Sequence, residues 1–368
     1  MTIPALVDRE DVRPRVDTLV ADHLASTRLD AEHRHGAETG PLYDALGRML
    51  SGGKRLRAAF AYWSWRAHGG AATSEQREGA LLIGASLELF QAAALFHDDV
   101  MDNSDTRRGL ATAHVHFARE HEAKGWPGDP ARYGLSAAVL LGDLALVASE
   151  DVFADALAHL PQHAVGATRA IFSTMRTEVT IGQYLDVLNQ VRPWSDDPVD
   201  DERRARAIIR AKSARYSVEH PLTLGAAAAG ADAARIERVV RFGLPLGEAF
   251  QLRDDVLGVF GDPAVTGKPA GDDLREGKRT VLLARTFQAA GEAERALVRD
   301  ALDSPELTDD DVARVRDVIV GSGALDSVER LIGDLSDQAF GALDALELDP
   351  EATTVLRALG YAAVERQS

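Results

Sequence analysis

Aspartates crowd into one short segment, His97–Gly109, with the sequence HDDVMDNSDTRRG. In a helix, Asp98, Asp102 and Asp105 would lie at i, i+4 and i+7 on a single face, with Asp99 rotated about 100° away. Carboxylates stacked in this way repel unless a cation lies between them. Hard oxygen ligands favour Mg²⁺ or Mn²⁺, with water and a substrate phosphate completing the octahedron. We therefore expect Asp98 and Asp102 to hold a divalent metal, with a solvated acidic helix end as the alternative.

Two neighbouring features favour the metal site. The segment ends an apolar helix, so its acids are expected at the rim of a hydrophobic core. Arg107 and Arg108 follow within two turns, and paired guanidinium groups suit bidentate contact with phosphate.

A second acidic pair, Asp254-Asp255, also ends an apolar helix, with Gln251 one turn before it. Its i+4 position is Gly258, so this site offers one stacked carboxylate where the first offers two. Charged and glycine-rich clusters accompany the two pairs: Gly52–Arg57, Gly267-Lys268-Pro269, Asp272-Asp273 and Gly277-Lys278-Arg279. Neither Lys54 nor Lys268 belongs to a Walker A loop. Taken singly, a basic cluster of this kind is more often a solvated surface than a binding site.

The elements that must position these residues are predicted to be helices, because no run of alternating β-branched residues is present. Thr73–Gln76 has the pattern of a capping box and predicts a helix from about Ser74 past Asp102. The other expected helices are 16–33, 41–68, 135–159, 164–189, 202–229, 233–259 and 280–289. Three segments rich in Gly, Pro or Asp predict loops: 125–134, 190–201 and 261–277.

Composition narrows the class of protein. The 368 residues contain no cysteine, which excludes disulfides, thiolate metal sites and a cysteine nucleophile. The net charge of −17 argues against nucleic acid as a partner. The longest apolar stretch, 80–96, is shorter than the roughly 20 residues of a membrane span and contains Glu88, so no transmembrane segment is expected. We expect a soluble, cytoplasmic protein with one all-α domain, 1–368. Its C-terminal part, 291–368, has a net charge of −11 and should form amphipathic helices with solvated faces.

Taken together and in order, the motifs resemble those of the all-trans polyprenyl diphosphate synthase family, most closely its geranylgeranyl diphosphate synthases. The core motifs cover residues 40–285. The matching pieces are GGKRLR at 52–57, DDVMDNSDTRRG at 98–109, GQYLD at 182–186, KS at 212–213, QLRDD at 251–255 and GKPAGDDLREGKRT at 267–280. The resemblance implies the isoprenoid synthase fold, a single large helical bundle around a central cavity, and a homodimer.

The resemblance also implies a reaction and its residues. Members of the family join isopentenyl diphosphate to an allylic diphosphate with Mg²⁺ or Mn²⁺, through two or three ions. The metal ligands would be Asp98, Asp102 and Asp254, with Asp99 and Asp255 supporting catalysis. The allylic diphosphate would bind Arg107, Lys212, Gln251, Lys268 and Lys278, with Gln183, Asp186 and Ser213 nearby. Isopentenyl diphosphate would bind Lys54, Arg55, Arg57, Arg108 and Gln91. The leaving diphosphate is expected to take the proton, so we expect no dedicated base.

Product length is predicted from the helix that carries Asp98. Ala94 and Ala93, four and five residues before the motif, are small where members that stop at fifteen carbons usually have an aromatic ring. One turn deeper are Leu89 and Phe90, and a turn of about 5.4 Å is roughly one isoprene unit. We therefore expect a twenty-carbon product, with Phe90 either the floor of the tunnel or an ordinary core residue.

Other functions remain open from sequence. The alternatives are a farnesyl or longer-chain synthase, a class I terpene cyclase, and a non-catalytic partner subunit. A cyclase has an Asn/Asp-Ser-Glu second motif, which Asp254-Asp255 does not match. A partner subunit would be expected to lose motif acids, as the glycine at position 258 hints. The family's Pro after GGKRxR is Ala58 here, and its usual Thr is Ser213.

Overall fold

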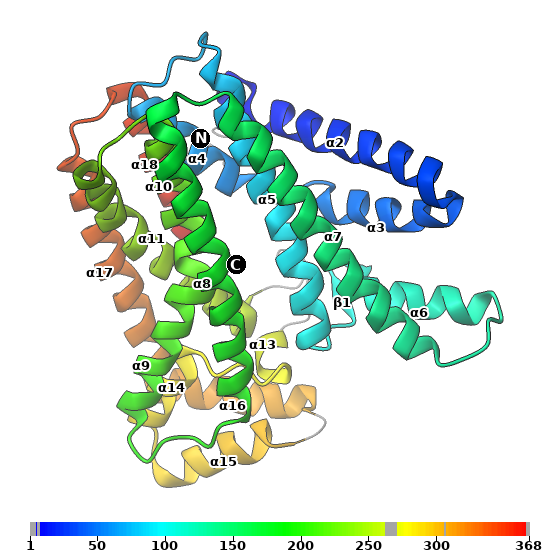
Figure 1. Cartoon of the computed structure of the whole chain (residues 1–368). Helices are drawn as coiled ribbons and strands as arrows, with labels where there is room; N and C mark the ends of the chain where they lie inside the picture. The colour runs from blue at the N-terminus through cyan, green and yellow to red at the C-terminus, as the bar shows by residue number, and fades with distance from the viewer. Residues whose placement is uncertain (1–4, 6–7, 262–270, 305–306, 366–368) are drawn as a thin grey trace. The chain divides into compact units, whose positions relative to one another are not determined.

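Helices make up most of residues 5, 8–261, 271–304 and 307–365, the parts of the chain that this computed structural model describes (Figure 1). The all-α expectation is therefore confirmed. The α-helices are α2 (Val12–His35), α3 (Gly40–Leu50), α4 (Leu56–Ala67), α5 (Gln76–Met101), α6 (Ala113–Ala123), α7 (Pro130–Ala158), α8 (Gln162–Val191), α9 (Pro198–Ile208), α10 (His220–Ala228), α11 (Ala233–Phe260), α13 (Asp272–Arg275), α14 (Val281–Ala289), α15 (Glu292–Leu302), α16 (Asp309–Gly321), α17 (Ala324–Asp344) and α18 (Pro350–Val364). Two 3₁₀ turns, η1 (Arg9–Asp11) and η2 (Ala37–Thr39), flank α2, and a π-helix, η3 (Ile209–Glu219), joins α9 to α10.

Contacts between residues divide the chain into two compact units. The first unit consists of Met1–Phe172, Pro221–Glu237 and Glu347–Leu359, and the second of Ser173–His220, Arg238–Leu346 and Gly360–Ser368. The expectation of one domain over 1–368 stays a prediction.

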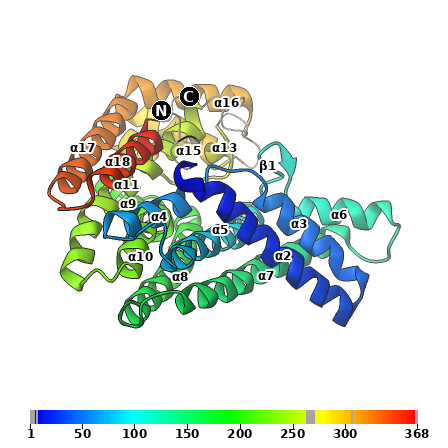
Figure 2. The same cartoon turned by 90° about the horizontal axis from the view of Figure 1, so that it is seen from above.

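In the first unit, α5 is the central helix. It packs along α7 and also contacts α2, α3 and α4 (Figures 1 and 2). By length and composition α5 could cross a membrane, but 78% of its most apolar window is buried inside the protein. It is therefore the core helix of a soluble protein, and it holds Asp98 at its last turn.

In the second unit, the π-helix η3 carries Lys212 and packs very closely against α8. A side chain on Gly182 of α8 would place its Cβ only 2.5 Å from the backbone nitrogen of Lys212. Gly247 of α11 is equally close, since a Cβ there would lie 2.3 Å from the carbonyl oxygen of Ala214. Continuous π-helix is rare and is often found at functional sites. Glycines on two helices thus allow η3 its close packing.

Two of the long helices expected from sequence are interrupted. The helix predicted for 41–68 is α3 followed by α4, because Gly52, Gly53 and Arg55 have φ values of 70°, 93° and 49°. The helix predicted for 202–229 consists of α9, η3 and α10. The other expected helices are present, with ends shifted by a few residues. Periodicity identified the helical segments but not the breaks within them; at residues 51–55 the available signal was the pair Gly52-Gly53.

Three smaller expectations are wrong. The helix α5 begins at Gln76 rather than Ser74, and its N-cap Glu75 makes no side-chain capping hydrogen bond. The loop predicted for 125–134 ends early, because α7 begins at Pro130, capped by the Asp129 carboxylate. A two-stranded antiparallel hairpin, β1 (Thr106–Arg107) with β2 (Leu110–Ala111), follows α5 although no strand was expected. A hairpin this short has no alternating pattern to detect.

Candidate active site

The first acidic group lies where α5 ends. Asp98 and Asp99 belong to its last turn, and the backbone N–H of Asp102 still donates to the Asp98 carbonyl at 2.8 Å. Asp98 and Asp102 are therefore one helical turn apart, as expected. Asp105 does not continue the stack, because Asn103 adopts φ 51° and turns the chain away from the helix axis. The prediction that Asp105 lies on the same face is wrong.

Arg107 connects this acidic group to the hairpin. Its Nε donates to Asp99 Oδ1 at 2.5 Å, and its Nη2 lies 3.7 Å from Asp98 Oδ2. The Asp99 side chain is 1% exposed and that of Asp98 20%. Charge-assisted bonds of this kind are short and orienting. Asp99 thus orients the Arg107 guanidinium, while Asp98 keeps access to solvent.

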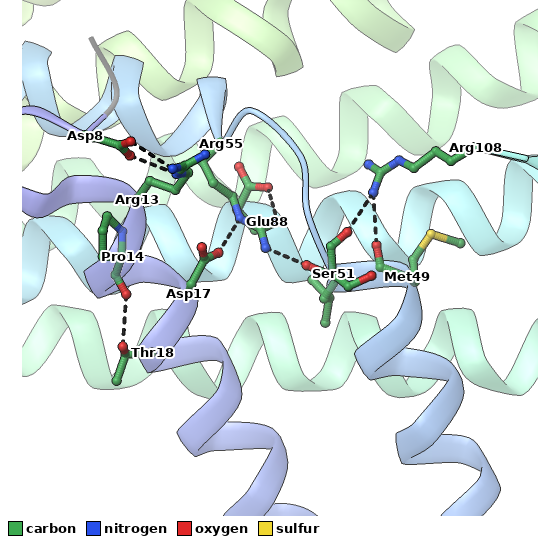
Figure 3. A network of polar contacts seen from close by, with 11 residues as sticks. Asp8, Arg13, Pro14, Asp17, Thr18, Met49, Ser51, Arg55, Glu88 and Arg108 are labelled. Carbon is green, nitrogen blue, oxygen red and sulfur yellow. Dashed lines mark hydrogen bonds and ion pairs between the residues drawn. The ribbon is translucent and has the colours of Figure 1, made fainter. Parts of the chain in front are cut away.

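Arg108 projects from the tip of the hairpin towards the loop after α3. It has φ 52° and the following Gly109 has φ 74°, which is the backbone pattern of a type I′ turn. Its Nη1 donates to the carbonyls of Ser51 (3.2 Å) and Met49 (3.4 Å), as Figure 3 shows. Burial lowers the pKa of Arg108, and the charges of Arg107, Arg55 and Arg57 lower it further. These arginines therefore form one positively charged cluster.

Residues 51–57 comprise the loop between α3 and α4 and the first two residues of α4, and are called the 51–57 loop. This loop presents its basic residues in different directions. Lys54 is exposed and Arg57 half-buried, but Arg55 is only 7% exposed. Arg55 is directed inward to Glu88 of α5 (Figure 3). Sequence reasoning assigned Glu88 no role in the site, although a single acid inside the apolar stretch 80–96 was the available signal.

In the second unit, Lys212 of η3 is paired with Asp186 of α8. The Lys212 Nζ lies 2.6 Å from Asp186 Oδ2, and the two side chains are 19% and 14% exposed. The close approach at Gly182 brings these two residues together. Gln183 and Ser213, also expected at the site, are half-buried on the same two elements.

The second acidic group lies near the end of α11. Asp255 is buried and accepts a hydrogen bond from Gln251 Nε2 at 2.9 Å. Burial, together with the charges of Asp273 and Asp254, raises the pKa of Asp255 to about 8. Asp254 itself is half-buried.

Among the described residues, Lys278, which follows α13, lies near this group, since its charge acts on Asp255. Lys278 Nζ lies 3.6 Å from Asp273 Oδ1 and is also ion-paired with Glu276. Lys268, the other lysine predicted for this site, lies outside the described residues.

The departure from the family pattern at Gly258 has a local explanation. A Cβ at position 258 would lie 1.9 Å from Asp273 Oδ2. The carboxylate of Asp273 thus occupies the space that a side chain at 258 would need.

The donors fit Mg²⁺ or Mn²⁺ because they are carboxylate oxygens. Among the described residues, no group of three or more His, Asp and Glu side chains could hold a metal ion by itself. Mg²⁺ commonly needs only one or two protein carboxylates, with water and phosphate oxygens supplying the rest. His97 faces away from this chemistry, since its Nε2 contacts the Val139 carbonyl (3.2 Å) and Asp143 (3.4 Å) on α7.

The residues expected to set product length lie along α5 before the acidic group. Leu89, Phe90 and Ala93 are buried, whereas Ala94 and the predicted ligand Gln91 are half-buried. Their roles stay predictions.

An all-helical chain with acidic groups at the ends of two apolar helices, each beside basic side chains, has the features of an isoprenoid synthase. The chain belongs to the polyprenyl synthetase family, whose model matches residues 40–319. It is accordingly a prenyltransferase, a polyprenyl diphosphate synthase.

Individual relatives agree on the family but differ in product. The geranylfarnesyl diphosphate synthase of Aeropyrum pernix is 34% identical over 88% of this chain and 93% of its own. The geranylgeranyl diphosphate synthase of Sulfolobus acidocaldarius is 32% identical over 76% of each chain. A crystal structure of geranylgeranyl pyrophosphate synthase from Corynebacterium glutamicum, complexed with isoprenyl diphosphate and magnesium, is 38% identical. It matches with a TM-score of 0.87 over 96% of this chain and 99% of that one. The isoprenoid synthase fold is thereby confirmed.

Proposed function

We propose that the protein condenses isopentenyl diphosphate with an allylic diphosphate to make geranylgeranyl diphosphate, with twenty carbons. The observation that carries this proposal is the acidic end of α5, where Asp98 and Asp102 lie one turn apart beside Arg107. The relative from Corynebacterium glutamicum, described with isoprenyl diphosphate and magnesium, supports the substrate class and the metal.

In the first unit Asp98 and Asp102 would hold metal, and in the second unit Asp254 would do so. Two or three Mg²⁺ ions, when bound, supply positive charge to the departing diphosphate oxygens. Asp99 would keep the Arg107 guanidinium aimed at the same oxygens. Gln251 would hold Asp255 through the bond between them.

The two diphosphates would bind different basic groups. Lys212, oriented by Asp186, would bind the allylic diphosphate together with Lys278 and Gln251. Isopentenyl diphosphate would bind the exposed Lys54 and half-buried Arg57 of the loop. These assignments include Arg108 and Gln91 on the isopentenyl side, and Arg107, Lys268, Gln183 and Ser213 on the allylic side.

The test is to incubate the protein with Mg²⁺, isopentenyl diphosphate and, in turn, dimethylallyl, geranyl and farnesyl diphosphate. Product length is then measured by mass spectrometry. We expect geranylgeranyl diphosphate as the end product from every primer. Hydrocarbon release would instead identify a terpene cyclase, and absence of product from all primers would favour a non-catalytic subunit.

Product length is tested by two substitutions on α5. Ala93→Phe would fill the buried space one turn before the acidic group, so we expect shorter products. Phe90→Ala would remove the proposed floor and lengthen them. If Ala93→Phe still makes the full-length product and Phe90→Ala makes nothing longer, the residues of this helix do not determine the length of the prenyl product.

We also propose a homodimer formed through α7. This helix exposes Tyr133, Leu140 and Val147, seven residues apart and therefore on one face, by 37%, 61% and 56%. Leu140→Glu should convert the dimer to a monomer in light scattering after gel filtration. Val320→Glu, at a 55% exposed position of α16, is the matched control. The cytoplasmic location expected from sequence stays a prediction.

A further inference from the structure

The loop between α3 and α4 has a conformation that its own backbone does not stabilise. Gly52, Gly53 and Arg55 all have positive φ. For Arg55, which has a Cβ, the left-handed conformation costs free energy and persists only where the surroundings impose it. Lys54, proposed to bind isopentenyl diphosphate, belongs to this loop, and Arg57, with the same proposed role, lies in the first turn of α4 directly after it. Something outside the loop must therefore maintain its shape.

The Arg55 side chain is that external support. Its Nη1 donates to Glu88 Oε2 of α5 at 3.0 Å, and its Nε donates to Asp17 Oδ1 of α2 at 2.7 Å. Its Nη2 donates to the carbonyl of Leu50, the last residue of α3. One guanidinium thus ties three helices to the loop, and Figure 3 shows its contacts with Glu88 and Asp17.

Glu88 is the partner that matters most for this arrangement. Its side chain is 4% exposed and that of Arg55 6%, whereas the Asp17 side chain is 48% exposed. Solvent screens the contact with Asp17, but a buried charge without its partner is strongly unfavourable. Glu88 is therefore the buried charge that compensates the inward-pointing guanidinium of Arg55.

Arg108 supports the same loop from the other side. While Arg55 binds the carbonyl of Leu50, Arg108 binds those of Met49 and Ser51. A Cβ on Gly53 would lie 3.8 Å from both guanidinium groups. The loop therefore passes between two arginines, of which Arg108 is the more exposed.

We propose that Arg55, held by Glu88, is a positioning residue that fixes the 51–57 loop so that Lys54 and Arg57 present their charges to the diphosphate of isopentenyl diphosphate. Arg55 itself then makes no substrate contact, in place of the direct binding expected from sequence. This inference rests on the proposed function for the identity of the ligand but not for the conformation of the loop.

Two substitutions test the proposal. Glu88→Gln keeps the shape of the side chain and removes its charge. Arg55→Lys keeps the positive charge beside Glu88 but replaces the planar fork, so it cannot make all three bonds. Arg13→Lys is the matched control, because Arg13 pairs with Asp8 at the start of the chain and not with a residue of the loop. Arg55→Lys decides the question if Glu88→Gln does not fold.

The first measurement is steady-state kinetics with both substrates. For either variant we expect KM for isopentenyl diphosphate to rise about tenfold, a loss comparable to one good hydrogen bond to a charged group. Neither kcat nor KM for the allylic diphosphate should change by as much. In a variant that was merely less stable, the apparent activity with both substrates would fall together.

The second measurement is hydrogen–deuterium exchange of the amides of residues 51–57 without substrate. We expect faster exchange in both variants and wild-type exchange in Arg13→Lys. Unchanged exchange, or a KM increase shared equally by the two substrates, would overturn the proposal. If the wild-type protein forms no prenyl product, the proposed function fails, while the exchange experiment still decides whether Arg55 and Glu88 hold the loop.

Discussion

Replacing Gly182 with alanine would test whether the contact between α8 and η3 positions Lys212. The added Cβ would lie 2.5 Å from the backbone nitrogen of Lys212, and 2.7 Å from Ala211 C and Lys212 Cα. All three atoms are backbone, so no side-chain rotation relieves the overlap. One of the two elements has to move.

The expected cost follows from that geometry. Overpacking of a tight contact typically costs about 1–3 kcal/mol. Alanine recovers roughly 0.5–1 kcal/mol of helix propensity over glycine. A net loss of about 1–2 kcal/mol would lower the Tm by roughly 1–3 °C for a protein of this size. The 2.6 Å contact between Lys212 and Asp186 would also lengthen, and we expect KM for the allylic diphosphate to rise about tenfold, as for the loss of one charge-assisted bond.

Differential scanning fluorimetry and steady-state kinetics measure these two effects. Gly166→Ala is the matched control, because Gly166 lies on the same helix and no atom of the described residues lies within 4 Å of the place its Cβ would take. It should raise stability by roughly 0.5–1 kcal/mol. If Gly182→Ala behaves like Gly166→Ala in both assays, the contact does not position Lys212.

Three further predictions concern the second unit. Asp254→Asn should reduce kcat at least a hundredfold and weaken Mn²⁺ binding in electron paramagnetic resonance, since it removes a proposed ligand charge. Burial raises the pKa of Glu219 to about 7, so folding should lose stability as pH rises from about 4.5 through 7. Glu219→Gln should remove this pH dependence, a difference of up to about 3 kcal/mol in the free energy of unfolding at pH 8. Urea unfolding at several pH values measures it. Gly258→Asp should displace the Asp273 carboxylate and raise KM for the allylic diphosphate, and an increase in kcat/KM would contradict that account.

The sequence was sufficient to predict structural features whose residues recur at a regular spacing or lie next to one another in the chain. The 3.6-residue periodicity predicted α5, α8 and α11, and the acids at the ends of α5 and α11 were found because they are adjacent in the chain. The stacking of Asp98 and Asp102 needed only helical geometry. The same geometry misplaced Asp105. The positive φ of Asn103 ends the helical stack, and the hydrophobic pattern does not predict it.

Contacts between distant segments could not be predicted from spacing. Asp273 fills the space over Gly258 from fifteen residues away, and Arg55 reaches Glu88 across thirty-three. The sequence contains both pairs, but their partners are chosen by how the helices pack. A basic residue in a motif therefore looks like a ligand whether it points out, like Lys54, or inward, like Arg55.

The orientation of the charged side chains also explains how a protein with a net negative charge can bind two anionic substrates. Net charge counts every group equally, although burial and pairing decide which charges act on a ligand. Asp99 and Glu88 are buried against arginines, so their charge orients guanidinium groups and does not repel a diphosphate. Burial is the main cause of the lowered pKa of Arg108; the charges of Arg107, Arg55 and Arg57 lower it further and that of Glu88 raises it, so the local potential sums three arginine charges and one opposing carboxylate. Neutralising Glu88 should therefore make that potential more positive, yet we expect weaker binding of isopentenyl diphosphate, because the loop that presents Lys54 loses its support. Tighter binding in Glu88→Gln would mean that charge, and not position, governs this site.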